Sequence, residues 1–364
     1  MKKWVFRIAC RKCTFIGQLR PLGNIREEDD VCFQITRQSL EKASLRILGR
    51  RFHKSKNTIL KIVHRVTARL PDSRWIAKQF CPSWSGILIF DGKVIRVFDA
   101  LSTRLKRSSL SEDEVRWLHK MRWLVGVDFG TGDLPHYDLA QSESRIELVI
   151  YFKILKSVGY PLKAVVCDGN ADIPRAARFV FGKDVVIQLC TRHFIKGLKR
   201  LLPADGLSDG TRKRLEKTIS LIQSVIESNT IEEAGKNLQN LKLFSSSFRH
   251  PLKMQCIKLF QRHKQELCAH FLHPELHLPH TSNDAENLIR QLNQRLKILG
   301  RFFSRHYAKD YLNAWALLRR FTPFTDCRGT RRYRNVKAPL ELAGCEIKNI
   351  DPLKLKHSNR ELGR

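Results

Sequence analysis

The strongest constraint on the fold is a pair of short apolar runs, rich in β-branched residues, at 164–167 and 185–189. Each run is too short for a helix and is typical of a buried strand. A helical pattern over about 174–181 separates the two runs, so this stretch predicts a strand–helix–strand step with parallel strands. Asp168 stands directly after the first run. Because sites in open sheets flanked by helices are built at strand ends, Asp168 is a candidate functional residue.

Three further strand patterns precede this step, at 86–91 with a continuation at 94–98, at 123–128 and at 134–139. An amphipathic helix follows from Ser144 to about Val158. Three strands in succession suggest an antiparallel meander, and the later step adds parallel strands. The order strand, strand, strand, helix, strand, helix, strand therefore predicts an α/β fold with a mixed sheet flanked by helices.

Residues 36–71 are expected to form a helix-turn-helix, with a first helix over about 39–50 and Ser55 as the N-cap of the second. One face of the second helix is apolar at helical spacing. Its other face carries side chains of the kinds that reach phosphates and base edges, namely Lys56, Asn57, Lys61, His64 and Arg65. We predict that this face binds DNA. A basic two-helix packing module is the alternative.

The rest of the chain divides by pattern into an irregular segment, a linker, the first part of the sheet domain, a helical stretch, two long helices and a basic, loosely structured tail. The corresponding residues are 1–35, 72–86, 86–193, 194–280, 281–321 and 322–364. Three histidines at 273, 277 and 280 are not expected to form a metal site, because prolines at 274 and 279 break any shared helical face.

Cys10 and Cys13, followed by Phe15, look like one knuckle of a zinc ribbon. A structural zinc site needs four ligands, and the nearby Cys32 and His53 match no known spacing. We therefore do not expect structural Zn²⁺, and favour two unpaired thiols. A zinc ribbon shortened from a longer ancestor is the alternative.

The balance of 67 Lys+Arg against 35 Asp+Glu gives a net charge of +32. Basic residues occur in all regions, and the commonest polyanionic partner of such a surface is nucleic acid. A protein that is basic because it binds ribosomes or membranes is the alternative. Single cysteines in apolar runs fit reduced thiols, and no segment approaches the roughly 20 apolar residues that span a bilayer. We expect a cytoplasmic protein bound to double-stranded DNA without membrane contact.

A second acid, Asp91, ends the first strand pattern. If that strand lies beside the one after the crossover, Asp91 and Asp168 face each other. Two clustered carboxylates with a third make an oxygen site suited to Mg²⁺, and a pair of such ions can clamp the attacking and leaving oxygens of a phosphodiester. Glu286, near the start of a helix, is the best third acid. Asp128 also ends a strand and competes with Asp91, but only Asp91 leaves three strands before the first helix.

Five landmarks together resemble an insertion-sequence DDE transposase of the Mutator-like type, which has a ribonuclease-H-like catalytic core. They occur in the order of the family: Asp91-Gly92, Glu143-Ser144, Asp168-Gly169, Cys190-x-x-His193 and Thr281-x-Asn283-x-x-Glu286. The resemblance covers about residues 36–321. It implies that Asp91, Asp168 and Glu286 are the catalytic ligands of Mg²⁺, with Mn²⁺ as a substitute. It also implies that the helices of 194–280 are an insertion, and that Cys190 and His193 are a signature pair beside the site.

The resemblance further implies a DNA transposase that cleaves transposon ends and transfers the strand to target DNA, working as a homodimer or a larger synaptic complex. An insertion-sequence protein of this kind would be bacterial or archaeal and nucleoid-associated. Two alternatives stay open, a catalytically inactive DNA-binding remnant and a ribonuclease-H-like nuclease or resolvase. The single residues also have plainer interpretations. Asp168 before a glycine fits a turn, and Glu286 three residues after Asn283 fits a capping box.

Overall fold

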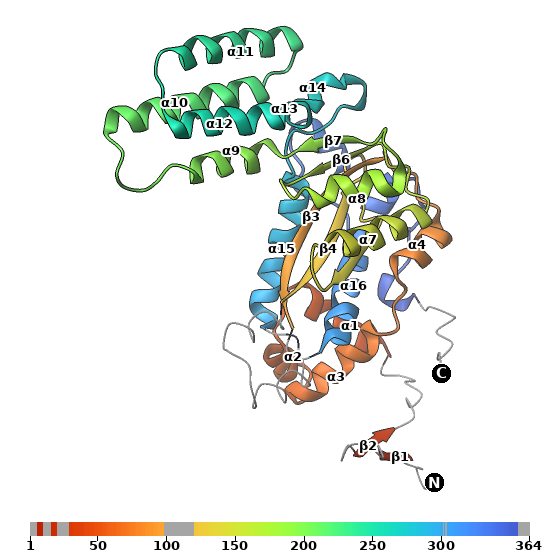
Figure 1. The fold of residues 1–364 in the computed structure, drawn as a ribbon. Coiled ribbons are helices and arrows are strands. Elements are labelled where there is room, and N and C mark those ends of the chain that lie inside the picture. Colours follow the sequence, from red (N-terminus) through yellow and green to blue (C-terminus); the bar gives the residue numbers. More distant parts are fainter. Residues whose placement is uncertain are drawn as a thin grey trace.

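The computed structural model describes residues 29–97, 120–300, 302 and 304–355, together with the backbone of two N-terminal strands, β1 (Phe6–Ala9) and β2 (Ile16–Leu19). At its centre is a five-stranded sheet with the order β5-β4-β3-β6-β7 (Figure 1). Its strands are β3 (Ile87–Arg96), β4 (Lys120–Asp128), β5 (Tyr137–Ala140), β6 (Ala164–Cys167) and β7 (Val186–Leu189). Strands β3, β4 and β5 are antiparallel, whereas β6 and β7 run parallel to β3. The predicted mixed sheet is confirmed, as is the predicted succession of strands and helices along the chain.

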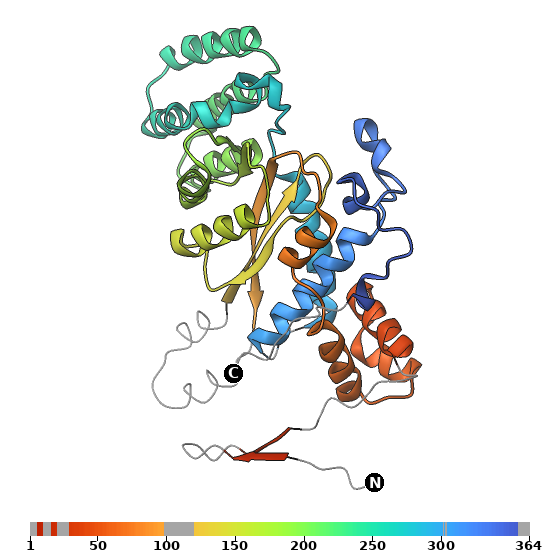
Figure 2. The same ribbon diagram turned by 90° about the vertical axis from the view of Figure 1, so that its right-hand side faces the viewer.

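Helices cover both faces of this sheet (Figure 2). On one face α7 (Arg145–Ser157) and α8 (Asp172–Phe181) pack on Leu88 and Phe90 of β3. On the other, α15 (Asn283–Leu299) and α16 (Arg305–Phe321) pack on Ile89 and its neighbours in β4. Because side chains alternate along a strand, β3 supplies both cores at once. The central strand is thus buried on two sides, which fits its continuous apolar run.

Strand β3 is continuous from Ile87 to Arg96, so Asp91, which we expected at the end of the first strand pattern, lies inside it. The nine residues of β4 pair with it from Leu88 to Arg96, so the ladder continues through Asp91 and Gly92. A glycine inside a strand often marks a close approach of another group. Here that group is a side chain from the loop before α7, described below.

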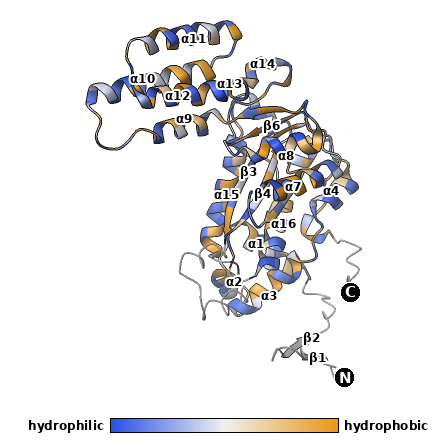
Figure 3. Cartoon of the chain, viewed as in Figure 1, coloured by the Kyte–Doolittle hydropathy of each residue, from blue (hydrophilic) through white to orange (hydrophobic). Residues whose placement is uncertain are grey.

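An all-helical segment lies between β7 and α15 and extends from the β7 end of the sheet (Figure 1). It comprises α9 (Thr191–Arg200), α10 (Asp209–Ile226), α11 (Ile231–Ser246), α12 (Pro251–Arg262), the short α13 (Lys264–Leu267) and α14 (Ala269–Leu272), and the turn η1 (Pro274–Leu276). Each of its longer helices carries both hydrophilic and hydrophobic residues (Figure 3). The expected helical character of 194–280 is confirmed.

Four helices precede the sheet: α1 (Asp29–Glu41), α2 (Leu45–Arg51), α3 (Lys56–Thr67) and α4 (Ser73–Phe80). The single helix predicted over 39–50 is wrong, because Ser44 accepts a hydrogen bond from the Ile47 N–H and starts a new helix there. Ser55 caps α3 as predicted. The linker expected at 72–86 is also wrong, since Asp72 caps α4 and Ile76 of that helix is buried.

The described residues in segments 1–35 and 322–364 form more regular structure than predicted. The segment 1–35 was expected to be irregular, but β1 and β2 pair antiparallel and α1 begins at Asp29. Cys10 and Cys13 lie outside the described residues. The expected loose tail contains η2 (Gly329–Arg334), α17 (Pro339–Leu342) and η3 (Pro352–Lys354). The buried Leu340 and Leu353 pack into the core of the α15–α16 face, which fixes this segment. In the part of the chain described here, no helix is long and apolar enough to cross a bilayer.

Candidate active site

The sheet register brings Asp91 and Asp168 to matching positions on neighbouring strands. In the parallel β3–β6 ladder Ile89 pairs with Val166. Two residues further along the chain stand Asp91, inside β3, and Asp168, directly after the end of β6. The conditional prediction that the two strands are neighbours is therefore correct, although Asp91 lies within its strand.

Burial raises the pKa of Asp91 to about 6. The Gly92 N–H donates a 2.7 Å hydrogen bond to Asp91 Oδ1 and opposes this rise. The negative charges of Asp168 and Glu143 raise the pKa further, while His193 lowers it. Like charges gathered around a half-buried carboxyl group are a common feature of functional sites.

A third carboxylate, Glu143, joins this pair from the loop before α7. A Cβ atom at position 92 would lie 1.6 Å from Glu143 Oε1, so only glycine there leaves room for it. Burial and the charge of Asp168 raise the pKa of Glu143, whereas Arg122, 3.9 Å away, lowers it. Sequence reasoning used Glu143 only as a landmark of the family. The glycine inside an apolar strand was the signal that another group approaches β3.

Asp168 also shapes the turn after β6. Its Oδ1 accepts a 3.0 Å hydrogen bond from the Asn170 N–H, and Asn170 Oδ1 accepts one from the Asp172 N–H. The Asn170 amide in turn donates to the Glu143 backbone carbonyl at 3.5 Å. The plain interpretation of Asp168 as a turn residue is thus correct, and the same turn holds the Glu143 loop beside it.

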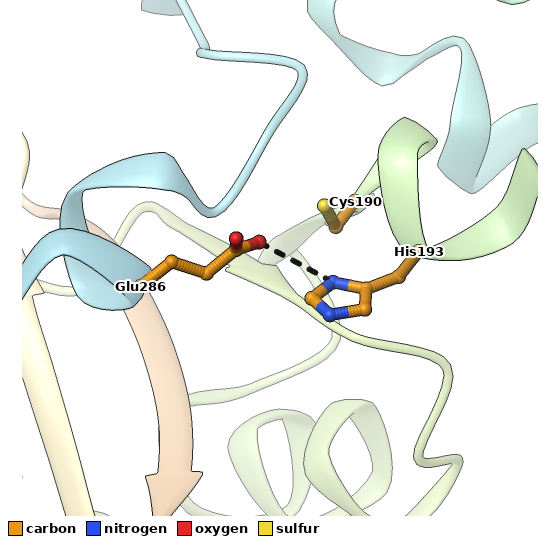
Figure 4. A group of neighbouring side chains, drawn as sticks. All are labelled: Cys190, His193 and Glu286. Atoms are coloured by element: carbon orange, nitrogen blue, oxygen red, sulfur yellow. Dashed lines mark ion pairs between the residues drawn. The ribbon is translucent and has the colours of Figure 1, made fainter. Parts of the chain in front are cut away.

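Glu286 meets Cys190 and His193 rather than the two aspartates (Figure 4). The ligand atoms of Cys190, His193 and Glu286 all lie within 4.8 Å of one another, with His193 Nδ1 3.8 Å from Glu286 Oε1. Among the described residues, this is the group close enough for a metal, and Asp91 and Asp168 are not part of it. His193 links the two groups of acids, because its pKa responds to the charges of both Glu286 and Asp91.

Two helix N-termini hold this cluster. Cys190 is the N-cap residue of α9, and His193 lies in its first turn, while Glu286 lies in the first turn of α15. The Ser282 N–H donates a 3.4 Å hydrogen bond to Cys190 Sγ, and Ser282 Oγ donates to Glu286 Oε1 at 3.2 Å.

The Cys190 thiol and the His193 imidazole shift each other's titration. Although burial raises the pKa of Cys190, hydrogen bonds from His193 and Ser282 lower it below its ordinary value. The hydrogen bond with Cys190 raises the pKa of His193, with the nearby carboxylates adding to the rise. Each of the two groups thus shifts the pKa of the other toward its charged form.

The rival acid Asp128 has a structural role. It is fully buried and accepts hydrogen bonds from the hydroxyl groups of Ser85 at 2.8 Å, Thr131 at 2.9 Å and Tyr160 at 2.8 Å. These donors consume the acceptor capacity of the carboxylate and close the turn after β4. Asp128 does not compete with Asp91 for a site role.

The proposed DNA-binding face of α3 is largely available. Lys56, Asn57 and Lys61 are exposed, and Arg65 is half-buried. His64 is also accessible, but its ring lies edge-on to Tyr307 and its Nε2 is 3.7 Å from Asp310 of α16. Because α3 packs on α16, this side chain is partly engaged by the body of the protein.

No protein-family model and no curated protein sequence matches the chain. Among solved structures, the fold is similar to that in the "Drosophila P element transposase strand transfer complex", with a TM-score of 0.33 and 14% sequence identity. The alignment covers 86% of this chain and 69% of that chain. A similarity this low carries no information about chemistry.

Proposed function

We propose that this chain is a DNA transposase, a polynucleotidyl transferase that cleaves DNA at the ends of a mobile element and joins them to a target. The observation that carries the proposal is the position of Asp91 and Asp168 at matching points of β3 and β6, with Glu143 against Gly92. The finer assignment to the Mutator-like type rests on the order of the five sequence motifs.

The residues around Asp91 fit a Mg²⁺ site by their chemistry. The carboxylates of Asp91, Asp168 and Glu143 supply hard oxygen donors. A bound cation would offset the negative charges of Asp168 and Glu143, which raise the pKa of Asp91. Asp91 and Asp168 would hold the metal, and Glu286 is proposed as the third ligand because His193 is close to the charges of both Glu286 and Asp91. When bound, Mg²⁺ or Mn²⁺ would activate water and stabilise the charge that develops on the phosphate.

The side chains of the protein would position DNA for this chemistry. The net charge of +32 attracts the phosphate backbone, and the basic face of α3 supplies a surface for one DNA end. We propose that α2 and α3 act as a helix-turn-helix and that the α9–α14 segment is an insertion that adds phosphate contacts. Since two ends must be held together, the active form would be a dimer or a larger assembly.

The test is a strand-transfer assay with the full chain, Mg²⁺ and DNA duplexes taken from the two flanks of its coding sequence. Wild type should release 3′ ends and join them to a plasmid. Asp91→Asn, Asp168→Asn and Glu286→Gln should each lower both reactions at least about 100-fold while DNA binding persists, because a carboxylate ligand is lost. Asp184→Asn, an exposed acid in the turn before β7, is the matched control.

The other outcomes separate the alternatives. Cleavage without joining would identify a nuclease or resolvase. Binding of the duplexes without cleavage, in wild type as in the variants, would identify an inactive DNA-binding remnant. Full activity in Glu286→Gln would remove Glu286 from the proposed triad while leaving the aspartate pair in place.

A further inference from the structure

We propose that Cys190, His193 and Glu286 form a binding site for a thiophilic divalent cation of the Zn²⁺ class, which does not include Asp91 or Asp168 but shares Glu286 with the Mg²⁺ site proposed above. The site stands on its own geometry and does not depend on the transposase proposal. A thiolate, an imidazole and a carboxylate are the three ligand types that zinc accepts in proteins.

The spacing of the three side chains suits such an ion. Ligand atoms around a tetrahedral zinc lie roughly 3.5 Å apart, given metal–ligand distances of about 2.0–2.3 Å. His193 Nδ1 and Glu286 Oε1 are already 3.8 Å apart, and the whole group lies within 4.8 Å. Small side-chain rotations would therefore bring all three onto one ion. Three protein ligands leave a fourth position open, as in sites that exchange water or a substrate atom.

Residues behind the ligands hold two of them in place. Ser282 donates its N–H to Cys190 Sγ and its hydroxyl to Glu286 Oε1, so one residue orients both side chains. A 3.0 Å hydrogen bond from the Thr191 N–H to the His280 carbonyl joins the start of α9 to the chain before α15. Residues that hydrogen-bond to the ligands of a metal are a regular feature of metal sites, and they tune the affinity for the ion.

The donor set selects against Mg²⁺. Mg²⁺ prefers six oxygen ligands and keeps several waters, whereas sulfur and nitrogen ligands favour Zn²⁺ and its neighbours in the transition series. Arg192 Nη1, 3.6 Å from Glu286 Oε2, is the cation that a metal would displace. The Arg192 side chain is 68% exposed, so it can move away at little cost.

One consequence rests on the proposed function. A Glu286 carboxylate bound to zinc beside Cys190 is not available to the aspartate pair. Zinc binding would then inhibit the Mg²⁺-dependent reaction, and a chelator selective for zinc would restore it.

The direct test is Co²⁺ titration of the full chain without DNA or Mg²⁺, in a Cys10→Ser/Cys13→Ser background that removes the N-terminal thiol pair. We expect one Co²⁺ per chain, with a thiolate-to-cobalt charge-transfer band and the intense visible bands of tetrahedral Co²⁺, both lost on adding Zn²⁺. Cys190→Ser should abolish the charge-transfer band. Loss of a residue that only hydrogen-bonds to a ligand weakens metal binding roughly 10–100-fold. His193→Ala and Glu286→Gln remove a ligand itself and should weaken Co²⁺ binding by more than this.

The controls are Cys81→Ser, His306→Ala and Glu232→Gln, which alter exposed residues of the same types elsewhere and should bind Co²⁺ like the background. Circular dichroism checks each variant for folding, and a rise of the midpoint of thermal unfolding with Zn²⁺ in the background chain gives a second readout. The proposed site is wrong if folded Cys190→Ser keeps the charge-transfer band, or if Zn²⁺ does not raise the midpoint of thermal unfolding of the background chain. Neither result requires catalysis, so failure of the transposase proposal leaves this test intact.

Discussion

Asp91 is held in an environment that opposes its own charge. It lies inside β3, half-buried, with Asp168 nearby at the end of β6 and Glu143 in the space left by Gly92. Burial and these like charges raise its pKa to about 6, so its ionised form is destabilised in the folded chain. A carboxylate whose charge is destabilised in this way is typical of a functional site, and a bound cation would stabilise that charge.

The pH dependence of stability tests this environment. The pKa of Asp91 is about 6 in the folded chain against an ordinary 3.8, so the folded state binds the proton more tightly. The contribution of Asp91 to the free energy of unfolding is therefore highest below about pH 4 and falls as the pH rises to about 6. Its charge costs at most about 3 kcal/mol at pH 7.

Asp91→Asn should accordingly be more stable than wild type at pH 7, by about 1–3 kcal/mol, with the difference shrinking toward pH 4. Urea unfolding at the two pH values, in a chelator that keeps the carboxylates free of metal, measures this. Asp184→Asn controls for the loss of one exposed negative charge. A variant at position 91 no more stable than that control at pH 7 would show that the carboxyl group is not destabilised.

At the scale of elements, one buried ion pair ties α16 to the turn between β4 and β5. Arg320 Nε and Nη2 each donate a 2.8 Å hydrogen bond to the Asp133 carboxylate, and both side chains are fully buried. Trp84 Nε1 adds a third donor at 2.9 Å. This anchor fixes the helix that covers one face of the sheet and against which α3 packs.

Arg320→Ala should lower the free energy of unfolding by about 3–5 kcal/mol, because it leaves the Asp133 charge buried without its partner. Arg305→Ala, which changes an exposed arginine at the start of the same helix, should cost far less. Denaturant unfolding at constant pH compares the two. Equal losses for both variants would mean that the ion pair does not anchor α16.

At the scale of the whole molecule, the positive charge should govern encounter with DNA. A net charge of +32 makes affinity strongly salt-dependent, since each neutralised phosphate releases counterions. If α3 contacts the backbone, its lysines contribute to that dependence directly and not merely through the general field of the protein.

We predict that Lys56→Gln/Lys61→Gln lowers the magnitude of the slope of log K against log salt by roughly 1–2, about 0.9 for each phosphate that is no longer neutralised. The control is Lys153→Gln/Lys183→Gln, which removes the same charge from exposed positions on α7 and the turn after α8. Fluorescence anisotropy with a labelled duplex at several salt concentrations measures both. A smaller slope change at Lys56 and Lys61 than in the control would place the DNA elsewhere.

The sequence by itself determined the order of strands and helices in the sheet domain. Apolar periodicity is local and can be read from the sequence, and the strand–helix–strand step predicts that β6 and β7 are parallel. That β3 and β6 are neighbours was only a condition at the sequence level, and the sheet order meets it. The closeness of Asp91 and Asp168 could therefore be predicted only conditionally. The local pattern predicted helix boundaries less reliably where a capping residue starts a new helix, as Ser44 does. It also missed the helices of the tail, because Leu340 and Leu353 are buried against residues that are distant in the sequence.

The tertiary structure alone decided which side chains complete each site. Glu143 reaches Gly92 because the loop between β5 and α7 approaches β3, and Glu286 meets Cys190 and His193 because two helix N-termini are joined at Ser282. Contacts of this kind join residues that are distant in the chain and leave no periodic trace in it. Sequence could name the acids, but only the meeting of the N-termini of α9 and α15 in the folded chain shows that Glu286 lies with a thiol and an imidazole.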